Sequence, residues 1–552
     1  MYVRVKTNPS KTSWRVMLCR SRRNGTSVRQ EVVKYLGTAK TEEQLMALRR
    51  IGLAEIHASK QAVENEREIA SEDLCEGASL GKMIEIARVS EGFHEVFGRT
   101  YDLLGFSHIL DSKLHDRVKD LVVARIAAPM SKRATSRTLS TRYGKDLPID
   151  TIYRSLDQLA KFEEEINLKI FDTTRQLCSN NQIDLLLFDV TTLYFESQKS
   201  DELRDFGYSK DHKVGEVQVV LALATTSDGL PIGYQLFSGK TAEVNTLLAC
   251  LTKWRKSFSI QSVCVVADRA MMSEDNLAAM EGAFLRYTVA AKLRTFPRKL
   301  KNEILSRRNE IEHTSSGERI LVQEHTISGR RLVVSYSEAR AQKDRSDRER
   351  LLSRLSRAAS STDISTRSLV TNRGYRKYFH ETVQGKMTFD TKVIEEEALW
   401  DGLHGVITND TVSTPPELLE RYRRLWIIEE SFRINKNTLE MRPIFHYKPR
   451  RIKAHILLCY IAFAVARYTQ RQVGLFHEHL SMECMREALT GVEASLLEDR
   501  DTGERYRLPS SMNDVAKGIY KSLGFKRSAH PSKIHMTKRK CSAHLKKLSR
   551  CG

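Results

Sequence analysis

"LLLFDVTTLYFE" (residues 185–196) is a strongly apolar run that is interrupted by one carboxylate, Asp189. Four large hydrophobic residues precede this aspartate, and the residues that follow it keep the composition of a β-strand. Two interpretations of Asp189 are open. Either the strand ends there in a turn, or a buried strand delivers the carboxylate to a metal ion.

A second apolar strand is predicted at residues 263–267, and it also leads into an aspartate, Asp268. Ser273 is the predicted N-cap of the helix that follows. Between the two aspartates, residues 216–225 and 230–239 read as strands separated by a Thr-Ser-Asp-Gly turn, which predicts a meander of three strands. A turn explains either aspartate alone, but two such strands favour a shared carboxylate site.

A third acid is expected on a long helix that begins near Thr414. Thr414 is the predicted N-cap, with Pro415 at the first helical position and Glu417 closing a capping box. On a continuous helix one arc of about 80° would hold Tyr422, Trp426, Glu429, Arg433 and Lys436. An adjoining apolar stripe would hold Leu425, Ile428 and Phe432. Glu429 would then lie among cations at the edge of the buried face; the alternative is a surface helix with a Glu429–Arg433 pair.

Composition limits the class of partner. The 552 residues carry a formal charge of +21 with a sequence pI near 9.5, which favours a polyanion such as nucleic acid over the main rival, an anionic membrane surface. The longest apolar stretch, residues 454–466, is too short to span a bilayer and is expected to be a core helix. Nine cysteines without a Cys-x-x-Cys pair and an N-terminus without an apolar signal core predict a soluble intracellular protein with reduced thiols.

The N-terminal third shows two patterns. Asn24-Gly25 between strand-like runs predicts a β-hairpin, whose arginines either contact phosphate or are simply solvated. From about residue 80 to 178 the pattern is helical. Residues 131–144 and the helix from Asp150 are candidates for a helix-turn-helix-like DNA reader, and an ordinary helical bundle with a basic face is the alternative.

Taken together, two aspartates on separate strands and a glutamate on a later helix resemble the arrangement of the DDE transposases. The helix resembles the signature Tyr-x2-Arg-x3-Glu-x6-Lys of one large group of bacterial insertion-sequence transposases, with Tyr422, Glu429 and Lys436 at its spacings. The resemblance covers roughly residues 183–470. The chain departs from the signature at the arginine position, which is Leu425, and Arg433 is the candidate to take over that contact.

The resemblance implies an α/β fold: an RNase H-like core, which is a mixed sheet flanked by helices, with a β-rich insertion domain. Residues 318–337 and 377–394 are strand-like with a highly charged helix between them, and "GVITND" (405–410) reads as the return to the core. The expected divisions are a small β-rich unit and linker (1–75), a helical DNA-binding region (76–178), the first part of the core (179–300), the insertion (301–400), the second part of the core (401–470) and a helical, basic C-terminal tail (471–552).

The resemblance also implies the chemistry. Asp189, Asp268 and Glu429 would bind two Mg²⁺ ions, with Mn²⁺ as a substitute and Asp189 as the bridge. Water attack would free a 3′-OH at an element end, and this hydroxyl would attack target DNA. The expected DNA contacts are Tyr422, Arg433 and Lys436. Lys210 and His212 are weaker candidates, for which a solvated loop is the favoured alternative.

The implied partners are the element's terminal inverted repeats and target DNA, bound by a homodimer or larger assembly at the nucleoid of a bacterial cytoplasm. Two other functions fit the same residues: a metal-dependent nuclease or resolvase without strand transfer, and a DNA-binding derivative without catalysis. In the tail, the spacing of His530, His535, Cys541, His544 and Cys551 matches no standard zinc site, so a basic arm on DNA is the favoured interpretation.

Overall fold

The computed structural model describes residues 1–8, 12–24, 27–65, 80–178, 181–195, 199–207, 216–258, 263–271, 273–307, 312–315, 318–359, 376–381, 387–477, 479–524 and 526–534. The chain forms two compact units, each built from segments that are distant in the sequence. Unit 1 comprises Met1–Thr174, Tyr194–Gln198 and Phe432–Gly552, and unit 2 comprises Arg175–Leu193 and Lys199–Ser431.

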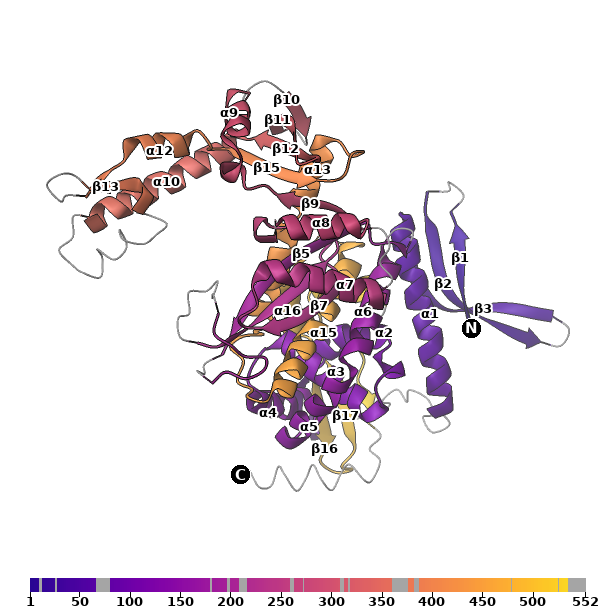
Figure 1. Cartoon of the computed structure of the whole chain (residues 1–552). Coiled ribbons are helices and arrows are strands. Elements are labelled where there is room, and N and C mark those ends of the chain that lie inside the picture. Colours follow the sequence, from indigo (N-terminus) through magenta and orange to yellow (C-terminus); the bar gives the residue numbers. More distant parts are fainter. Residues whose placement is uncertain are drawn as a thin grey trace. The chain divides into compact units, whose positions relative to one another are not determined.

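Unit 1 is organised around one long helix, α15 (Pro449–Gly474) (Figure 1). Its residues from Ala454 to Gln470 are all buried, which confirms the predicted core helix. By length and composition alone α15 could cross a membrane, but 94% of its most apolar window is buried inside the protein. The other main helices of unit 1 are α1 (Glu42–Asn65), α2 (Arg99–Leu103), α3 (Ser112–Ala127), α4 (Lys132–Tyr143), α5 (Ile149–Leu159), α6 (Glu163–Leu177), α16 (Met482–Thr490) and α17 (Asp514–Ser522).

Two antiparallel sheets complete unit 1. The first has the order β1-β2-β3, built from β1 (Tyr2–Thr7), β2 (Trp14–Asn24) and β3 (Ser27–Ala39). In it Asn24 pairs with Ser27, so the predicted hairpin is present, although Gly25 lies outside the described residues. The second sheet has the order β18-β17-β16-β4, built from β18 (Ser532–Lys533), β17 (Arg505–Pro509), β16 (Glu493–Asp499) and β4 (Met83–Ser90).

Unit 2 is built on a mixed nine-stranded sheet with the order β10-β11-β12-β15-β9-β8-β5-β6-β7. Its strands are β5 (Leu185–Tyr194), β6 (Gln218–Thr225), β7 (Pro231–Ser238), β8 (Cys264–Ala267), β9 (Arg286–Ala290), β10 (Glu312–Ser315), β11 (Glu318–Ile327), β12 (Arg330–Tyr336) and β15 (Leu403–Thr408). The pairs β5–β8 and β8–β9 are parallel, whereas β6–β7, β9–β15, β15–β12, β12–β11 and β11–β10 are antiparallel. The strands expected at residues 318–337 therefore extend the same sheet that carries β5 and β8.

Helices pack against this sheet and confirm an α/β arrangement (Figure 1). They are α7 (Thr246–Phe258), α8 (Glu274–Gly282), α9 (Arg298–Ser306) and α13 (Pro415–Arg423). The helices α10 (Glu338–Ala359) and α12 (Thr391–Ala398) share a separate small apolar cluster, and α14 (Trp426–Arg433) follows α13. The charged segment after β12 is helical as predicted, and it forms α10. The strand-like stretch 377–394 is only partly so: β13 (Phe379–Glu381) and β14 (Met387–Phe389) form a small hairpin, but the chain turns helical at Thr391 because Asp390 caps α12.

Candidate functional site

The two aspartates leave adjacent parallel strands at adjacent positions. In the register of β5 and β8, Phe188 pairs with Ala267, and Asp189 and Asp268 are the next residues along each strand. Neighbouring strands lie about 4.8 Å apart, so both carboxylates start from nearly the same point of the sheet. Asp189 is half-buried and Asp268 is exposed. Strand β5 does not end in a turn at Asp189, which is one of the two interpretations that the sequence leaves open, but continues to Tyr194; only its pairing with β8 stops at Phe188.

The return strand β15 brings further residues to the same edge of the sheet. Because β15 is antiparallel to β9, its amino end lies beside the carboxyl end of β9: Val406 pairs with Ala290, and the Ala291 N–H donates to the Gly405 carbonyl at 2.8 Å. His404 is one residue further toward this edge. A pocket of about 720 Å³ opens there, with a lining that includes Asp268, Arg269, Arg340, Trp400, His404 and Tyr422.

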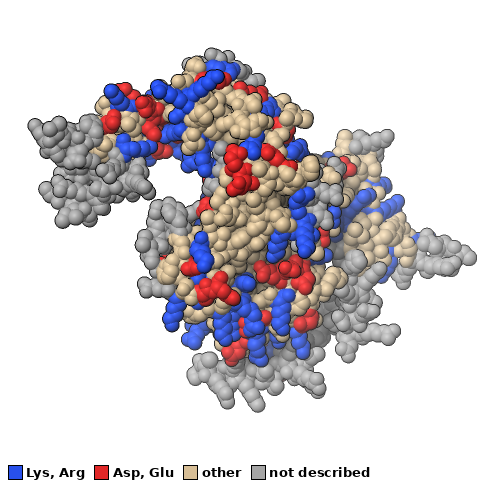
Figure 2. All heavy atoms as spheres, viewed as in Figure 1, with Lys and Arg blue, Asp and Glu red and all other residues tan. Residues whose placement is uncertain are grey.

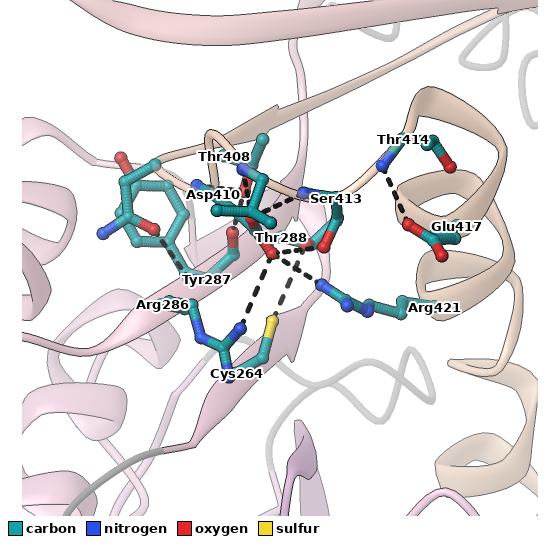
Figure 3. A network of polar contacts seen from close by, with 12 residues as sticks. Cys264, Arg286, Tyr287, Thr288, Thr408, Asp410, Ser413, Thr414, Glu417 and Arg421 are labelled. Atoms are coloured by element: carbon teal, nitrogen blue, oxygen red, sulfur yellow. Dashed lines mark hydrogen bonds and ion pairs between the residues drawn. The ribbon is translucent and has the colours of Figure 1, made fainter.

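Helix α13 begins at the opposite edge and runs along the sheet to this pocket. Its start is fixed by Asp410, which is 2% exposed and follows the carboxyl end of β15 (Figure 3). The Asp410 carboxylate accepts hydrogen bonds from Ser413 N at 3.0 Å, Ser413 Oγ at 2.7 Å and Arg421 Nη1 at 2.8 Å, with Arg286 at 3.9 Å. Burial raises the pKa of Asp410, but these donors outweigh burial and hold the pKa well below its usual range.

The predicted start of this helix is confirmed. Glu417 accepts a hydrogen bond from Thr414 N at 2.8 Å, and the capping box is present with Pro415 in the first turn. Leu418 and Leu419 pack on Val322, Val333 and Val406 of the sheet, and Tyr422 packs against the same cluster. Nine residues at 1.5 Å each span about 13 Å, so α13 carries Tyr422 from the Asp410 edge toward the aspartate edge.

The helix is not continuous, and this corrects the expected arc. Helix α13 ends at Arg423 and α14 begins at Trp426. Between them Leu425 N bonds to Tyr422 O at 3.0 Å and Ile428 N bonds to Leu425 O at 3.1 Å, a tighter i→i−3 pattern that changes the direction of the side chains. A second change follows, because residues 434–438 form a π-helical turn. One 100° rotation per residue therefore does not describe the path from Tyr422 to Lys436.

The tight turn also explains the residue in the signature arginine position. Leu425 is 7% exposed, and Ile428 and Phe432 of the predicted apolar stripe are 0% and 6% exposed. Position 425 therefore faces the core of the fold, where an apolar side chain is suitable. Arg433 is exposed and Lys436 is half-buried, whereas Lys210 and His212 lie outside the described residues.

Tyr422 lies close enough to Asp268 and Glu429 for their charges to affect its hydroxyl. Burial is the main cause that raises the pKa of Tyr422, and the negative charges of Asp268 and Glu429 raise it further. Its hydroxyl therefore stays protonated at neutral pH and remains a hydrogen-bond donor. The ring of Tyr422 lies 4.8 Å from that of His404, with an angle of 39° between the rings. Burial and the nearby Arg340 lower the pKa of His404 to about 4, so this imidazole is neutral at pH 7.

The fit of these residues to metal ions can be judged from their side chains. Carboxylate oxygens are suitable ligands for hard divalent cations, and the parallel register places Asp189 and Asp268 together. Glu429 is exposed on α14 and has no hydrogen-bond or ion-pair partner for its side chain within the described ranges. In the part of the chain that the structure describes, no three His, Cys, Asp or Glu side chains are gathered into a metal-binding group. The register thus brings the two aspartates to neighbouring positions, and within the described residues no third potential ligand is gathered with them.

Sequence reasoning missed His404 and Asp410. Both belong to the stretch "LHGVITND", in which an apolar strand is flanked by a histidine and an aspartate. The same signal, a polar residue beside a buried strand, had identified Asp189 and Asp268. Arg340 carried no such signal, because it lies in a helix that is rich in charged residues.

Comparison with known proteins identifies the class. The family model described as a transposase DDE domain matches residues 180–465, which is more than half of the chain. The chain therefore belongs to the family of transposases with a DDE domain. DDE transposases generally use divalent metal ions. No curated protein matches the chain significantly.

One solved structure is similar over most of its length. It is a cryo-EM structure of a piggyBac transposase synaptic complex with hairpin DNA, 11% identical, and the match covers 73% of this chain and 78% of that chain. The TM-score is 0.34, a value too low to establish a common fold.

Proposed function

We propose that this protein binds the ends of an insertion element and catalyses metal-dependent cleavage and strand transfer, with Asp189, Asp268 and Glu429 as the acidic residues of the site. The observation that carries the proposal is the register of β5 and β8, because it places two carboxylates side by side within the matched family domain. The run β7-β6-β5-β8-β9, with parallel pairs β5–β8 and β8–β9, supports an RNase H-like core.

In this proposal the three carboxylates hold two Mg²⁺ ions, or Mn²⁺ in their place. Bound divalent cations supply an activated water and neutralise the charge that develops on the scissile phosphate. Glu429 completes the ligand set when its exposed side chain approaches the aspartates. Tyr422 keeps its proton and donates to a phosphate oxygen, and Arg433 and Lys436 are proposed to contact neighbouring phosphates.

DNA is the proposed partner of further surfaces. The exposed arginines Arg133 and Arg137 lie about one turn apart on α4, in the predicted DNA-binding region. Figure 2 shows Lys and Arg over much of the visible face, with Asp and Glu interspersed. We propose that a homodimer or larger assembly brings two element ends together, and that the chain is of the bacterial insertion-sequence group with the Tyr422, Glu429 and Lys436 spacing.

The test uses a labelled duplex that carries the sequence flanking the coding region, a target plasmid and Mg²⁺. We expect joined products; cut products alone would identify a nuclease, and shifted bands alone a DNA-binding derivative. Asp189→Asn, Asp268→Asn and Glu429→Gln should each abolish cutting and joining but leave binding intact or slightly tighter, because removing an anion reduces repulsion.

Asp275→Asn is the matched control, because Asp275 is an exposed aspartate of the same unit at the start of α8. It should cut and join at the wild-type rate. Wild-type cutting by Asp189→Asn or Asp268→Asn would refute the assignment of the site.

A further inference from the structure

Two histidines of the same sheet differ in one respect. His325, on β11, has both ring nitrogens bonded: Nδ1 to Glu303 Oε1 at 3.0 Å and Nε2 to Gln323 Oε1 at 3.0 Å. His404, on β15, has a buried Nε2 without any hydrogen-bond partner among the described residues. A buried polar atom without a partner costs free energy, so an unpaired nitrogen in a pocket points to a group that binds there.

The charged groups nearest to His404 are two cations, Arg340 and Arg269, and one acid, Asp268. His404 and Arg340 both line the pocket that contains Asp268, together with Arg269. Among the described residues Arg340 has one ion-pair contact, with Asp344 at 3.9 Å, and both side chains are well exposed, so the guanidinium is weakly held. Arg269 has no hydrogen-bond or ion-pair partner within the described ranges.

The segment before β15 holds α10 in place. Gly402 N donates to Asp344 Oδ2 at 3.0 Å, and Arg348 Nη2 donates to Asp401 Oδ2 at 2.7 Å. The pair of Arg348 and Asp401 is largely buried, with side chains 14% and 6% exposed. Asp344 lies about one turn and Arg348 about two turns after Arg340, so these two interactions fix the first turns of α10 beside the start of the strand that carries His404.

We propose that His404 and Arg340 form a phosphate-binding subsite, which holds one backbone phosphodiester of the bound DNA strand beside Asp268. A phosphodiester is the ligand that suits both groups, because it accepts a hydrogen bond from an imidazole N–H and a charge-assisted bond from a guanidinium. The subsite rests on the proposed function, because it takes its phosphate from the DNA that this function requires. It adds two residues that the signature of the Glu429 helix does not include.

The test replaces phosphates one at a time. A series of element-end duplexes, each with a single neutral methylphosphonate, is titrated by fluorescence anisotropy in EDTA with the wild type, Arg340→Gln and His404→Gln. For the wild type we expect about 10-fold weaker binding at one or two adjacent positions beside the cleavage site. At those positions a methylphosphonate should not weaken the binding of either variant, because each variant has already lost the phosphate contact. Arg340→Gln should also lower the slope of log affinity against log salt by about one phosphate contact.

Two controls accompany the series. Arg350→Gln removes a cation of the same helix that is 75% exposed and lies outside the pocket lining, and it should keep the wild-type profile. His325→Gln removes a fully bonded histidine of the same sheet and should keep that profile too. Because Arg340 is exposed, Arg340→Gln should fold like the wild type even if His404→Gln is destabilised. Urea unfolding of both variants checks their stability.

The outcomes separate this proposal from the proposed function. A wild-type profile in both Arg340→Gln and His404→Gln, from a chain that still joins ends in Mg²⁺, would overturn the subsite alone. A chain that joins no ends but shows the expected loss at the same phosphates would support the subsite and contradict strand transfer.

Discussion

At the scale of single residues, Leu425 illustrates how position decides what a side chain can do. Its place in the tight turn between α13 and α14 buries it, so an arginine there would carry an unpaired charge into the buried interior. Arginine at position 425 is therefore expected to lower the stability of the fold rather than to add a contact with DNA.

Leu425→Arg should lower the free energy of unfolding by about 2–4 kcal/mol, whereas Leu425→Met should cost about 1 kcal/mol. Urea unfolding of both variants measures the difference. Wild-type stability of Leu425→Arg would show that position 425 can reach solvent, and would reopen a role for an arginine there.

Lys132 is a second residue whose behaviour is determined by burial, here through its pKa. It is 7% exposed, and its Nζ lies 3.3 Å from His455 Nδ1, with Arg125 and Cys459 nearby. Burial, and then Arg125, lower the pKa of Lys132 to about 7 from its ordinary value of 10.5. The folded state thus binds this proton less tightly than the unfolded state. The charged lysine therefore lowers the free energy of unfolding fully below pH 7, and this loss disappears as the pH rises toward 10.5.

Lys132→Met should therefore stabilise the protein at pH 6 by about 2 kcal/mol, after a loss of about 1 kcal/mol for the hydrogen bond to His455. The advantage should shrink and then reverse between pH 7 and pH 10. Thermal unfolding of both proteins across this range measures the difference in stability. A difference that does not change with pH would contradict the lowered pKa of Lys132.

At the scale of elements, α13 depends on the Asp410 anchor. Asp410→Asn weakens the bonds to Ser413 and Arg421, and Arg421→Met leaves the carboxylate without its closest cation. Each single variant should lose about 3 kcal/mol of unfolding free energy. The double variant should lose much less than the sum of the two single losses, because the two residues act as a pair.

The pH dependence gives this prediction a sign. Since the pKa of Asp410 is depressed in the folded state, its contribution is complete above the ordinary value of 3.8 and is lost as the pH falls below it. The difference between wild type and Asp410→Asn should be largest near neutral pH and shrink in acid. Additive losses in the double variant, or a difference that grows in acid, would refute the anchor.

The same elements show what sequence could and could not predict. The apolar runs before Asp189 and Asp268 and the capping box of α13 are local signals, so the strands and the helix start were predicted correctly. The parallel register that brings the aspartates together joins residues almost eighty positions apart, and no local pattern encodes it. The turn at Leu425 was missed because a periodicity of 100° per residue assumes an unbroken helix.

At the scale of the whole molecule, the positive charge predicts a steep response to salt. Residues 535–552 carry six of the cations, Lys538, Arg539, Lys540, Lys546, Lys547 and Arg550. Truncation after Ile534 should reduce the slope of log affinity against log salt by up to about five on a mixed-sequence duplex. Anisotropy at four salt concentrations measures it. An unchanged slope would show that the basic tail makes no phosphate contacts.

After β9 the chain first forms β10, β11 and β12 at the outer end of the sheet, and only then returns with β15 between β12 and β9. The segment between Tyr336 and Leu403 therefore starts from one strand of the sheet and ends at the strand beside it. Over evolutionary time such a segment can lengthen, shorten or be exchanged without moving the strands on either side of it. Lineages could therefore remodel this segment, including the helix that bears Arg340, while they inherit Asp268 and the α13 anchor unchanged. Related chains should then differ in length most within this interval.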